Sequence, residues 1–361
     1  MAERPQFNVP GGQTAKVSII DSSLRLSGMP LSHLLKPPMK GLETMPTVTT
    51  WSFLVESPAG KKVLFDLGVP KNPLENFSPK YANTIRESSW GVDVKANVAD
   101  ILRDNDVQPS EIDSVIWSHH HFDHIGDVTT FPGSTELVVG PGFKDAFCPG
   151  YPAQQDSPVR EVDFKGRDLK EIDFENQPLR IGPFRAFDFF GDGSFYLLDT
   201  PGHAIGHLAG LVRTTAGPDT FILMGGDLCH HGGELRPSPY LPFPPKLSDH
   251  LSLSDSLRLR LSRCPGSEVF DDINVKRGRA ARQTFFDPAI GVDKEQALRT
   301  IQETQKADAQ DNIFCIFAHD MSVFDVIDTF PKTANDWKAK EWREKTLWKF
   351  LNDIEAAIPE Q

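Results

Sequence analysis

The chain is short of cysteine and of long apolar runs. Its four cysteines, Cys148, Cys229, Cys264 and Cys315, are far apart and form no CxxC pair. That spacing excludes a disulfide framework and a structural zinc knuckle, and it predicts reduced, mostly buried thiols. No apolar run approaches the ~18–20 residues of a membrane-spanning helix, and the polar, Pro/Gly-rich N-terminus carries no signal-peptide core. We therefore expect a cytoplasmic protein with no membrane partner.

Basic side chains are also fewer than acidic ones. The 361 residues include 38 Lys and Arg against 50 Asp and Glu, which gives a net charge of −12. Because an acidic surface repels phosphate backbones, nucleic acid is not an expected partner. Hydrophobic residues make up 39% and charged residues 24%, the balance of a globular protein with a substantial core. Composition leaves monomer and homodimer open.

Segments rich in β-branched and aromatic residues fall into two groups along the chain. They predict strands at 16–20, 47–56, 62–67 and 113–117, before the stretch 118–127, and after it at 136–139, 184–190, 195–198, 208–213, 220–224 and 313–317. Apolar residues at helical spacing predict helices over 94–105, 294–307 and 335–356. Strand groups that are each followed by helices predict two β-sheets packed face to face, with the helices outside.

Two segments have no such pattern. Residues 24–43 combine apolar residues with three prolines and show no clear period, which predicts a long loop. Long loops in compact domains tend to be functional. Residues 234–288 begin with the Pro-rich RPSPYLPFPP and later carry the basic stretch KRGR at 276–279. We expect that basic stretch to be a solvated loop rather than an anion site.

Histidine is concentrated in one place. Four of the 11 histidines stand in residues 118–127, SHHHFDHIGD, directly after a predicted strand. A single imidazole at a strand end is usually an ordinary surface residue, but four so close together would repel one another when protonated. The spacing His119-x-His121-x-Asp123-His124 can direct several side chains to one point, and imidazole with carboxylate suits zinc and similar divalent ions.

Further ligand-type residues follow three other predicted strands. They are His203 in the tetrad TPGH, Asp227 in GGD and His319 in AHD. Four ligands from one loop cannot complete two coordination spheres by themselves. Side chains on turns at strand ends are held rigidly, so these three are candidates for the remaining positions.

Together, HxHxDH, TPGH, GGD, AHD and an early DLG at 66–68 resemble the metallo-β-lactamase superfamily of hydrolases over about residues 48–320. The resemblance implies a layered α/β (α+β) fold, an αββα sandwich of two mixed sheets with external helices, and two metals at the sheet edge. It implies that the chain forms one domain, 1–361, with an active-site loop at about 24–43 and an insertion at about 234–288. The implied ligands are His119, His121 and His203 for the first metal and Asp123, His124 and His319 for the second, with Asp227 bridging. Zn²⁺ is the expected ion, with Mn, Fe or Co as alternatives.

Other members of this superfamily fit the sequence less well. An iron–oxygen reductase of this fold would carry a carboxylate in place of His121. A β-lactamase of the related subgroup lacks the bridging Asp227, and a tRNA-processing nuclease would need a basic face. The best local resemblance is to the quorum-quenching acyl-homoserine lactonases, which share SHxHFDHxG and TPGHxxGH.

This second resemblance implies a hydrolase that opens a small lactone or a related ester through attack of a hydroxide bridging two metals. A thioesterase of the glyoxalase or polyketide-processing type is the alternative. A metal-binding scaffold without turnover would show a degraded ligand set, and here all seven positions are filled.

We expect Asp123 and His230 to be catalytic, and Phe122, Met29 and His230 to bind substrate. Asp123 would help to pass a proton to the departing alkoxide. The lactonases carry a tyrosine three residues after the bridging aspartate, where this chain has His230. Histidine can donate a hydrogen bond to a carbonyl or protonate a leaving alkoxide. Phe122, shared with the lactonase motif, and Met29, in a loop expected to close over the metals, are further candidates.

Overall fold

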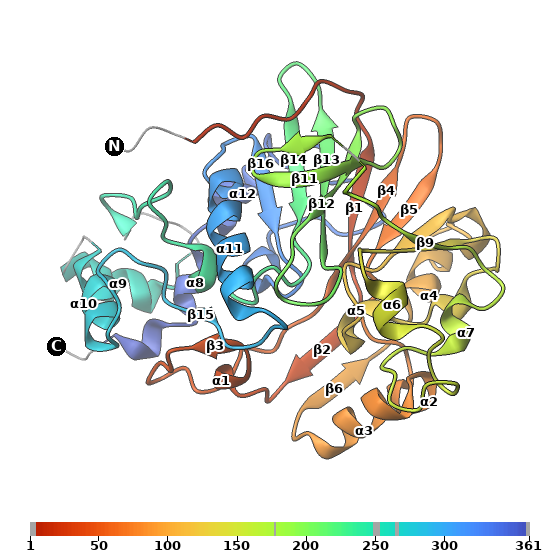
Figure 1. Cartoon of the computed structure of the whole chain (residues 1–361). Helices are drawn as coiled ribbons and strands as arrows, with labels where there is room; N and C mark the ends of the chain where they lie inside the picture. The colour runs from red at the N-terminus through yellow and green to blue at the C-terminus, as the bar shows by residue number, and fades with distance from the viewer. Residues whose placement is uncertain (1–4, 177, 248–252, 264–266, 359–361) are drawn as a thin grey trace.

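Two six-stranded sheets form the centre of the computed structural model, which describes residues 5–176, 178–247, 253–263 and 267–358 (Figure 1). The first sheet has the order β1-β4-β5-β7-β8-β9 and the second has the order β10-β11-β12-β13-β14-β16. The strands of the first sheet are β1 (Lys16–Asp21), β4 (Trp51–Glu56), β5 (Lys62–Phe65), β7 (Ser114–Ile116), β8 (Glu136–Val139) and β9 (Leu169–Glu171). Those of the second are β10 (Arg180–Ile181), β11 (Phe184–Asp188), β12 (Phe195–Asp199), β13 (Leu208–Thr215), β14 (Thr220–Met224) and β16 (Ile313–Ile316).

Both sheets mix parallel and antiparallel pairs. In the first, β1, β4 and β5 are antiparallel neighbours, and β5, β7, β8 and β9 run parallel. In the second, β10 to β14 are antiparallel neighbours, and β16 joins β14 in parallel. The expected fold, two mixed sheets with external helices, is confirmed.

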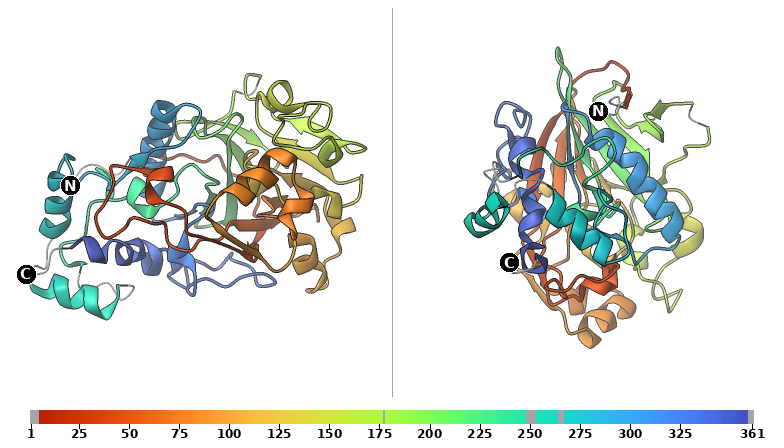
Figure 2. Two further views of the ribbon diagram at one scale, coloured as in Figure 1. Left: turned by 90° about the horizontal axis from the view of Figure 1, so that it is seen from below. Right: turned by 90° about the vertical axis from the view of Figure 1, so that its left-hand side faces the viewer.

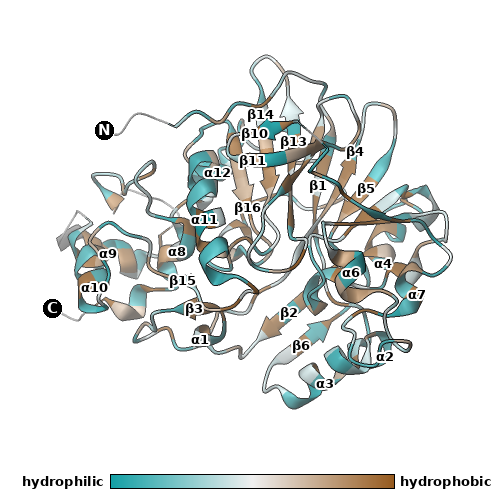
Figure 3. Ribbon diagram, viewed as in Figure 1, coloured by the Kyte–Doolittle hydropathy of each residue, from teal (hydrophilic) through white to brown (hydrophobic). Residues whose placement is uncertain are grey.

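Alternation along the strands explains how the sheets pack. Successive side chains of a strand point to opposite faces. In β14, Ile222 and Met224 lie in a buried cluster that both sheets share, whereas Phe221 and Leu223 lie in a cluster with Ile301 of α11 (Lys294–Asp308). The strands are therefore apolar on both faces, which Figure 3 shows as brown ribbon at the centre of the molecule.

Helices cover the outer faces. α11 packs outside the second sheet, and α4 (Val98–Arg103) contributes to the cluster outside the first. The other α-helices are α1 (Leu31–Leu34), α2 (Pro73–Asn76), α3 (Pro79–Glu87), α5 (Phe122–Ile125), α6 (Phe143–Phe147), α7 (Glu161–Phe164), α8 (Gly232–Leu235), α9 (Asp255–Arg263), α10 (Glu268–Lys276) and α12 (Trp342–Thr346). Short 3-10 turns are η1 (Pro109–Glu111), η2 (Val128–Thr130), η4 (Met321–Val323), η5 (Lys349–Asn352) and η6 (Glu355–Ala357).

The predicted helix over 335–356 is wrong. The structure has α12, η5 and η6 there, separated by breaks, and Glu341 before α12 has a left-handed backbone with φ 58°. The apolar residues of this segment serve two different cores. Trp337 packs against Phe314 between the sheets, and Trp348 packs against Phe243 in the outer cluster. One straight helix could not direct both tryptophans to these sites.

Residues 24–43, predicted as a loop, contain short regular elements. β2 (Leu24–Ser27) pairs with β6 (Gly91–Val94), and β3 (Leu35–Lys36) follows α1 and pairs with β15 (Asp287–Pro288). Seen from below, this red segment passes between the orange helices α2 and α3 and the blue-green helices of residues 234–288 (Figure 2). The segment is therefore tied at both ends to parts of the chain far away in sequence.

Two expectations from composition can be compared with the structure. Cys148, Cys229 and Cys315 are free thiols, and Cys229 and Cys315 are buried; Cys264 lies outside the described residues. Among the helices that the structure describes, none has both the length and the apolar character that crossing a membrane demands.

Candidate metal centre

The ligand-type residues stand on turns that directly follow strands of both sheets. His119 and His121 follow β7, and the short helix α5 then carries Asp123 and His124. His203 follows β12, Asp227 follows β14 and His319 follows β16. The parallel pairing of β14 with β16 carries the last two turns to the same sheet edge.

The structure brings all seven predicted residues together in two groups. One group is His119, His121, His203 and Asp227, and the other is Asp123, His124, Asp227 and His319. Within each group, one nitrogen or oxygen atom from every member lies within 4.8 Å of the others. Asp227 is common to both groups.

The carboxylate of Asp227 divides its two oxygens between the groups. Its Oδ2 lies 3.7 Å from His119 Nε2 and 3.5 Å from His203 Nε2. Its Oδ1 lies 3.2 Å from His124 Nε2 and 3.3 Å from His319 Nε2. A carboxylate with this orientation can bind one ion through each oxygen.

These separations fit metal coordination better than hydrogen bonding. Zinc–ligand bonds of ~2.0–2.1 Å in a tetrahedron put neighbouring ligand atoms about 3.3 Å apart. In addition, His119 Nε2, His124 Nε2 and Asp227 Oδ1 are buried and have no hydrogen-bond partner. Buried polar atoms are normally paired, so the donor set fits a pair of divalent ions. His121 and His203 also face each other with ring nitrogens 3.0 Å apart.

Asp66 orients one of the imidazoles. Its Oδ2 lies 2.7 Å from His124 Nδ1 and accepts a hydrogen bond from Ser118 Oγ, and its Oδ1 accepts from the Ser118 backbone N–H. Asp66 belongs to the DLG triplet at the end of β5, where φ is +59°. The carboxylate fixes the proton of His124 on Nδ1 and leaves Nε2 free to bind a metal.

Two further contacts orient the remaining turns. His319 Nδ1 lies 2.8 Å from the carbonyl oxygen of Thr49, so Nε2 is directed toward Asp227. His207 Nε2 accepts a hydrogen bond from the Asp227 backbone N–H, while its Nδ1 contacts the carbonyl of Thr200. His207 therefore positions the Asp227 turn.

Burial and neighbouring charges shift the pKa values of the imidazoles in two directions. Burial, and then the neighbouring imidazoles, hold the pKa of His119 and of His203 well below the usual range. Burial likewise lowers the pKa of His121 to about 4. Burial would also lower the pKa of His319, but the carboxylates of Asp227 and Asp123 outweigh it and raise that pKa to about 10. Neutral imidazole is the form that binds metal.

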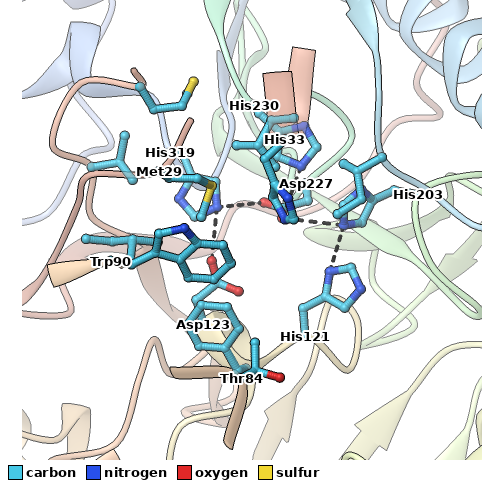
Figure 4. Close-up of a pocket in the computed structure, with 16 residues that line it drawn as sticks. Met29, His33, Thr84, Trp90, His121, Asp123, His203, Asp227, His230 and His319 are labelled. Atoms are coloured by element: carbon cyan, nitrogen blue, oxygen red, sulfur yellow. Dashed lines mark hydrogen bonds and ion pairs between the residues drawn. The ribbon is translucent and has the colours of Figure 1, made fainter. Parts of the chain in front are cut away.

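An apolar cavity of about 190 Å³ opens above the two groups. Its lining includes Asp227 and other members of both groups, shown in Figure 4 with dashed lines from His319 to Asp123 and to Asp227. The apolar part of the lining is Leu26, Met29, Leu34, Met45, Val48, Trp90, Phe122 and Ile290. A compact, largely apolar molecule can therefore approach the carboxylates.

Comparison with known proteins agrees with this geometry. A model of the Metallo-beta-lactamase superfamily matches residues 45–263. The chain belongs to the metallo-β-lactamase superfamily. This is a superfamily of metal-dependent hydrolases, and the His and Asp groups described above could hold metal ions.

Relatives and a solved structure extend the comparison. The chain is 42% identical to gamma-lactamase FDB1 of Fusarium pseudograminearum, over 97% of this chain and 85% of that protein. It is 48% identical to gamma-lactamase MBL2 of Gibberella moniliformis, over 63% of this chain and 91% of that protein. It spans 39% of the length of some longer curated relatives. The crystal structure of a quorum-quenching N-acyl homoserine lactone hydrolase has a TM-score of 0.56 and 18% identity, over 90% of this chain and all of that one, so it shares the fold.

In this metallo-β-lactamase superfamily chain, His230 lines the cavity. Its Nε2 lies 3.5 Å from Asp227 Oδ2, its backbone N–H donates to Glu234 Oε2, and both ring nitrogens lack a hydrogen-bond partner. Burial disfavours its charged form, but Asp227 and Glu234 outweigh burial and raise the pKa to about 9. The sequence analysis did not predict that Glu234 contacts His230, although Glu234 stands only four residues after it.

The neighbouring histidines are directed elsewhere. His231 accepts a hydrogen bond from the Gly233 backbone N–H, lies 3.3 Å from Asp353 and packs against Phe286, so it turns away from the cavity. His120 packs against Phe147 with ring centroids 4.1 Å apart.

The predicted substrate contacts Phe122 and Met29 do line the cavity. Sequence reasoning missed His33 and Trp90, which contact each other edge-on across 5.3 Å, with Trp90 also stacked on Phe122. Neither residue belongs to a motif, and they come from segments far apart in the sequence.

The expectation of a solvated basic stretch at 276–279 is wrong for two of its residues. Arg279 is buried and donates to Asp287 and to the carbonyl of Thr284. Arg277 is half-buried and donates to the carbonyls of Pro37 and Pro38. These guanidinium groups bind neighbouring parts of the chain because the insertion folds back onto residues 24–43.

Proposed function

We propose that this hydrolase opens the ring of a small γ-lactone or γ-lactam, with two divalent metal ions, zinc by preference, held by the seven residues of the candidate centre. The observation that carries the proposal is the Asp227 carboxylate, which presents one oxygen to each ligand group at the floor of an apolar cavity. The reaction adds OH to the ring carbonyl carbon, breaks its bond to the ring oxygen or nitrogen, and leaves a carboxylic acid with a free alcohol or amine.

The bound ions would supply Lewis acidity for the carbonyl and a lowered pKa for an attacking water. The chain's own residues do the rest. His230, beside Asp227 and fixed through Glu234, donates a hydrogen bond to the ring heteroatom as its bond to carbon breaks. Asp123, which lines the cavity and lies 3.3 Å from His319 Nε2, is placed to pass a proton toward the same atom.

The choice of a cyclic substrate rests on the relatives and on the cavity. Two relatives that are 42% and 48% identical are named gamma-lactamases. One solved structure of the same fold holds N-hexanoyl-L-homoserine, the product of a lactone, at its catalytic metal centre. A lactone and a lactam present the same carbonyl carbon, so one centre serves either ring. The apolar lining favours an uncharged ring over a charged open-chain substrate.

A hydrolysis screen with metal analysis tests this proposal. Purified protein is assayed against γ-lactones, γ-lactams, β-lactams, open-chain esters and thioesters, and its metal content is measured in parallel. We expect about two ions per chain and turnover of the five-membered rings. Preferential turnover of thioesters would support the alternative of a thioesterase and overturn the lactone or lactam proposal.

Asp227→Ala tests the shared carboxylate. Because Asp227 contacts both ligand groups, the variant should lose affinity for both ions together and lose most of its activity. Asp163→Asn is a matched control, because Asp163 is an equally buried carboxylate that pairs with Arg160 outside both groups. Loss of a single ion in Asp227→Ala, with the other retained at full affinity, would contradict a bridging role.

A further inference from the structure

Arg277 joins the insertion to the segment that covers the cavity. It stands directly after α10, and its Nε and Nη2 donate hydrogen bonds of 2.9 and 2.5 Å to the carbonyls of Pro38 and Pro37. Its guanidinium also lies 4.9 Å from the ring centroid of Phe286. The planar guanidinium thus holds two successive carbonyls and an aromatic face at once, which a lysine could not do.

The groups that the Arg277 guanidinium contacts are uncharged. Burial, with the nearby charge of Arg279, lowers the pKa of Arg277 to about 10, and no ion pair is formed by Arg277 within the described residues. Its Nη1 is buried without a hydrogen-bond partner. Burying a guanidinium against neutral carbonyls costs free energy. Because Arg277 is nevertheless half-buried against the carbonyls of Pro37 and Pro38, we infer that it fixes these two residues.

The segment that Arg277 holds forms one wall of the cavity. We define the wall as residues 29–38, which include α1 and β3 and place Met29, His33 and Leu34 in the cavity lining. An isolated helix as short as α1 has no stability of its own. The position of the wall therefore depends on what holds it from outside.

A second connection runs from the wall to the metal centre. Residues 287–293 begin with β15, which pairs with β3, and the Ala289 N–H donates to the Leu34 carbonyl. Ile290 then lines the cavity, and the N–H of Val292 donates to the carbonyl of His203. One stretch of backbone thus contacts both the wall and a ligand turn, and Arg277 reinforces the wall end of it.

We propose that Arg277 is a positioning residue that keeps the wall closed over the cavity and thereby maintains substrate affinity without touching substrate. The inference rests on the proposed function for its kinetic consequence. A wall that is closed in only a fraction of molecules lowers apparent affinity by that fraction. Arg277 itself contacts Pro37, Pro38 and Phe286, none of which belongs to the ligand groups, so the chemical step should be unchanged.

Three variants test the proposal: Arg277→Met, Arg277→Lys and Lys276→Met as the matched control. Lys276 is the exposed neighbouring cation at the end of α10. Steady-state kinetics on the best ring substrate of the screen are measured with amide hydrogen exchange and metal content. We expect Arg277→Met to raise KM about tenfold, as when the wall is closed in about a tenth of molecules. The kcat should stay within about twofold of the parent and the metal content should not change.

The exchange measurement follows the amide of Ala289, which bonds the wall. It should exchange faster in Arg277→Met, while the amide of Leu223 inside the second sheet stays protected. Arg277→Lys should show a smaller change in both readouts, and it decides the question if Arg277→Met does not fold. Lys276→Met should match the parent.

Parent-like KM and exchange in a folded Arg277→Met would overturn the proposal, as would a fall in kcat with unchanged KM. If the parent protein turns over none of the ring substrates, the proposed function fails. The exchange of Ala289 then decides separately whether Arg277 holds the wall.

Discussion

Asp66→Asn should weaken metal binding without unfolding the protein. Asp66 lies outside both ligand groups, but it accepts hydrogen bonds from His124 Nδ1, Ser118 Oγ and the Ser118 backbone N–H. An asparagine has the same shape and tolerates the left-handed backbone at this position, where φ is +59°. Its amide group, however, can offer only one oxygen. Either His124 Nδ1 or the Ser118 N–H must then face an NH₂ group.

The size of the effect follows from what Asp66 does for His124. Substituting a residue that orients a metal-binding histidine typically costs ~10–100-fold in metal affinity, equivalent to about 1.4–2.7 kcal/mol. The wild-type carboxylate lies 2.7 Å from a fully buried imidazole, so we expect a value toward the upper end of that range. The loss should be larger in the group that contains His124, because Asp66 contacts His124 directly and reaches His119 only through Ser118 Oγ, which lies 3.1 Å from His119 Nδ1.

Chelator competition measures this directly. Metal release from Asp66→Asn is followed against a chromogenic chelator, with Asp163→Asn as the control for removing a buried carboxylate elsewhere. We expect one ion of the pair to be released at a lower chelator concentration than in the parent, while Asp163→Asn retains both. Equal affinity for both ions in folded Asp66→Asn and the parent would refute the role given to Asp66.

Two further predictions concern catalysis and stability. His230→Ala should lower kcat by about 10²–10⁴-fold, and its metal content should stay unchanged. His230→Tyr should retain more lactone turnover than His230→Ala. Loss of metal from His230→Ala would instead indicate that His230 is a metal ligand. Asp308→Asn should lower the free energy of unfolding by about 3–5 kcal/mol at pH 7, because Asp308 forms a buried two-point ion pair with Arg236. Burial alone would raise the pKa of Asp308, but Arg236 outweighs it and holds the pKa below the usual range. The ion pair's contribution is therefore present above about pH 4 and lost as pH falls through the folded pKa, so urea titrations of parent and variant should converge in acid.

The seven residues of the candidate centre could be predicted to lie together because they stand on turns that follow apolar strands. A run such as Thr220–Met224 identifies a buried strand without any knowledge of the fold, and Gly225-Gly226-Asp227 then places a carboxylate at its end. The fold class followed from the same strands, since buried strands on both sides of the His cluster require two apolar layers. Both predictions rest on patterns within short stretches of sequence.

The features that the sequence did not predict depend on contacts between residues far apart in the chain. The helix predicted over 335–356 failed because Trp337 and Trp348 pack into different cores, and their spacing alone cannot reveal this. His33 and Trp90 meet only through the way that β2 pairs with β6, and Arg277 reaches Pro37 only through the pairing of β3 with β15. No periodicity in a single chain encodes such long-range pairing.

The parallel pairing of β14 with β16 has a consequence for the order in which the molecule assembles. Residues 225–312 separate the two strands, so His319 reaches Asp227 only after this long stretch has been synthesised and β16 has docked. His119, His121, His203 and Asp227 are all available by residue 227, so one ion could be captured during translation and the second only near its end. An ion that binds the native state and not the unfolded state raises the free energy of unfolding. The increase is about 2.7 kcal/mol when the free ion is a hundred times more concentrated than its Kd. Metal supply would then affect the stability of the C-terminal strand β16 once it has docked.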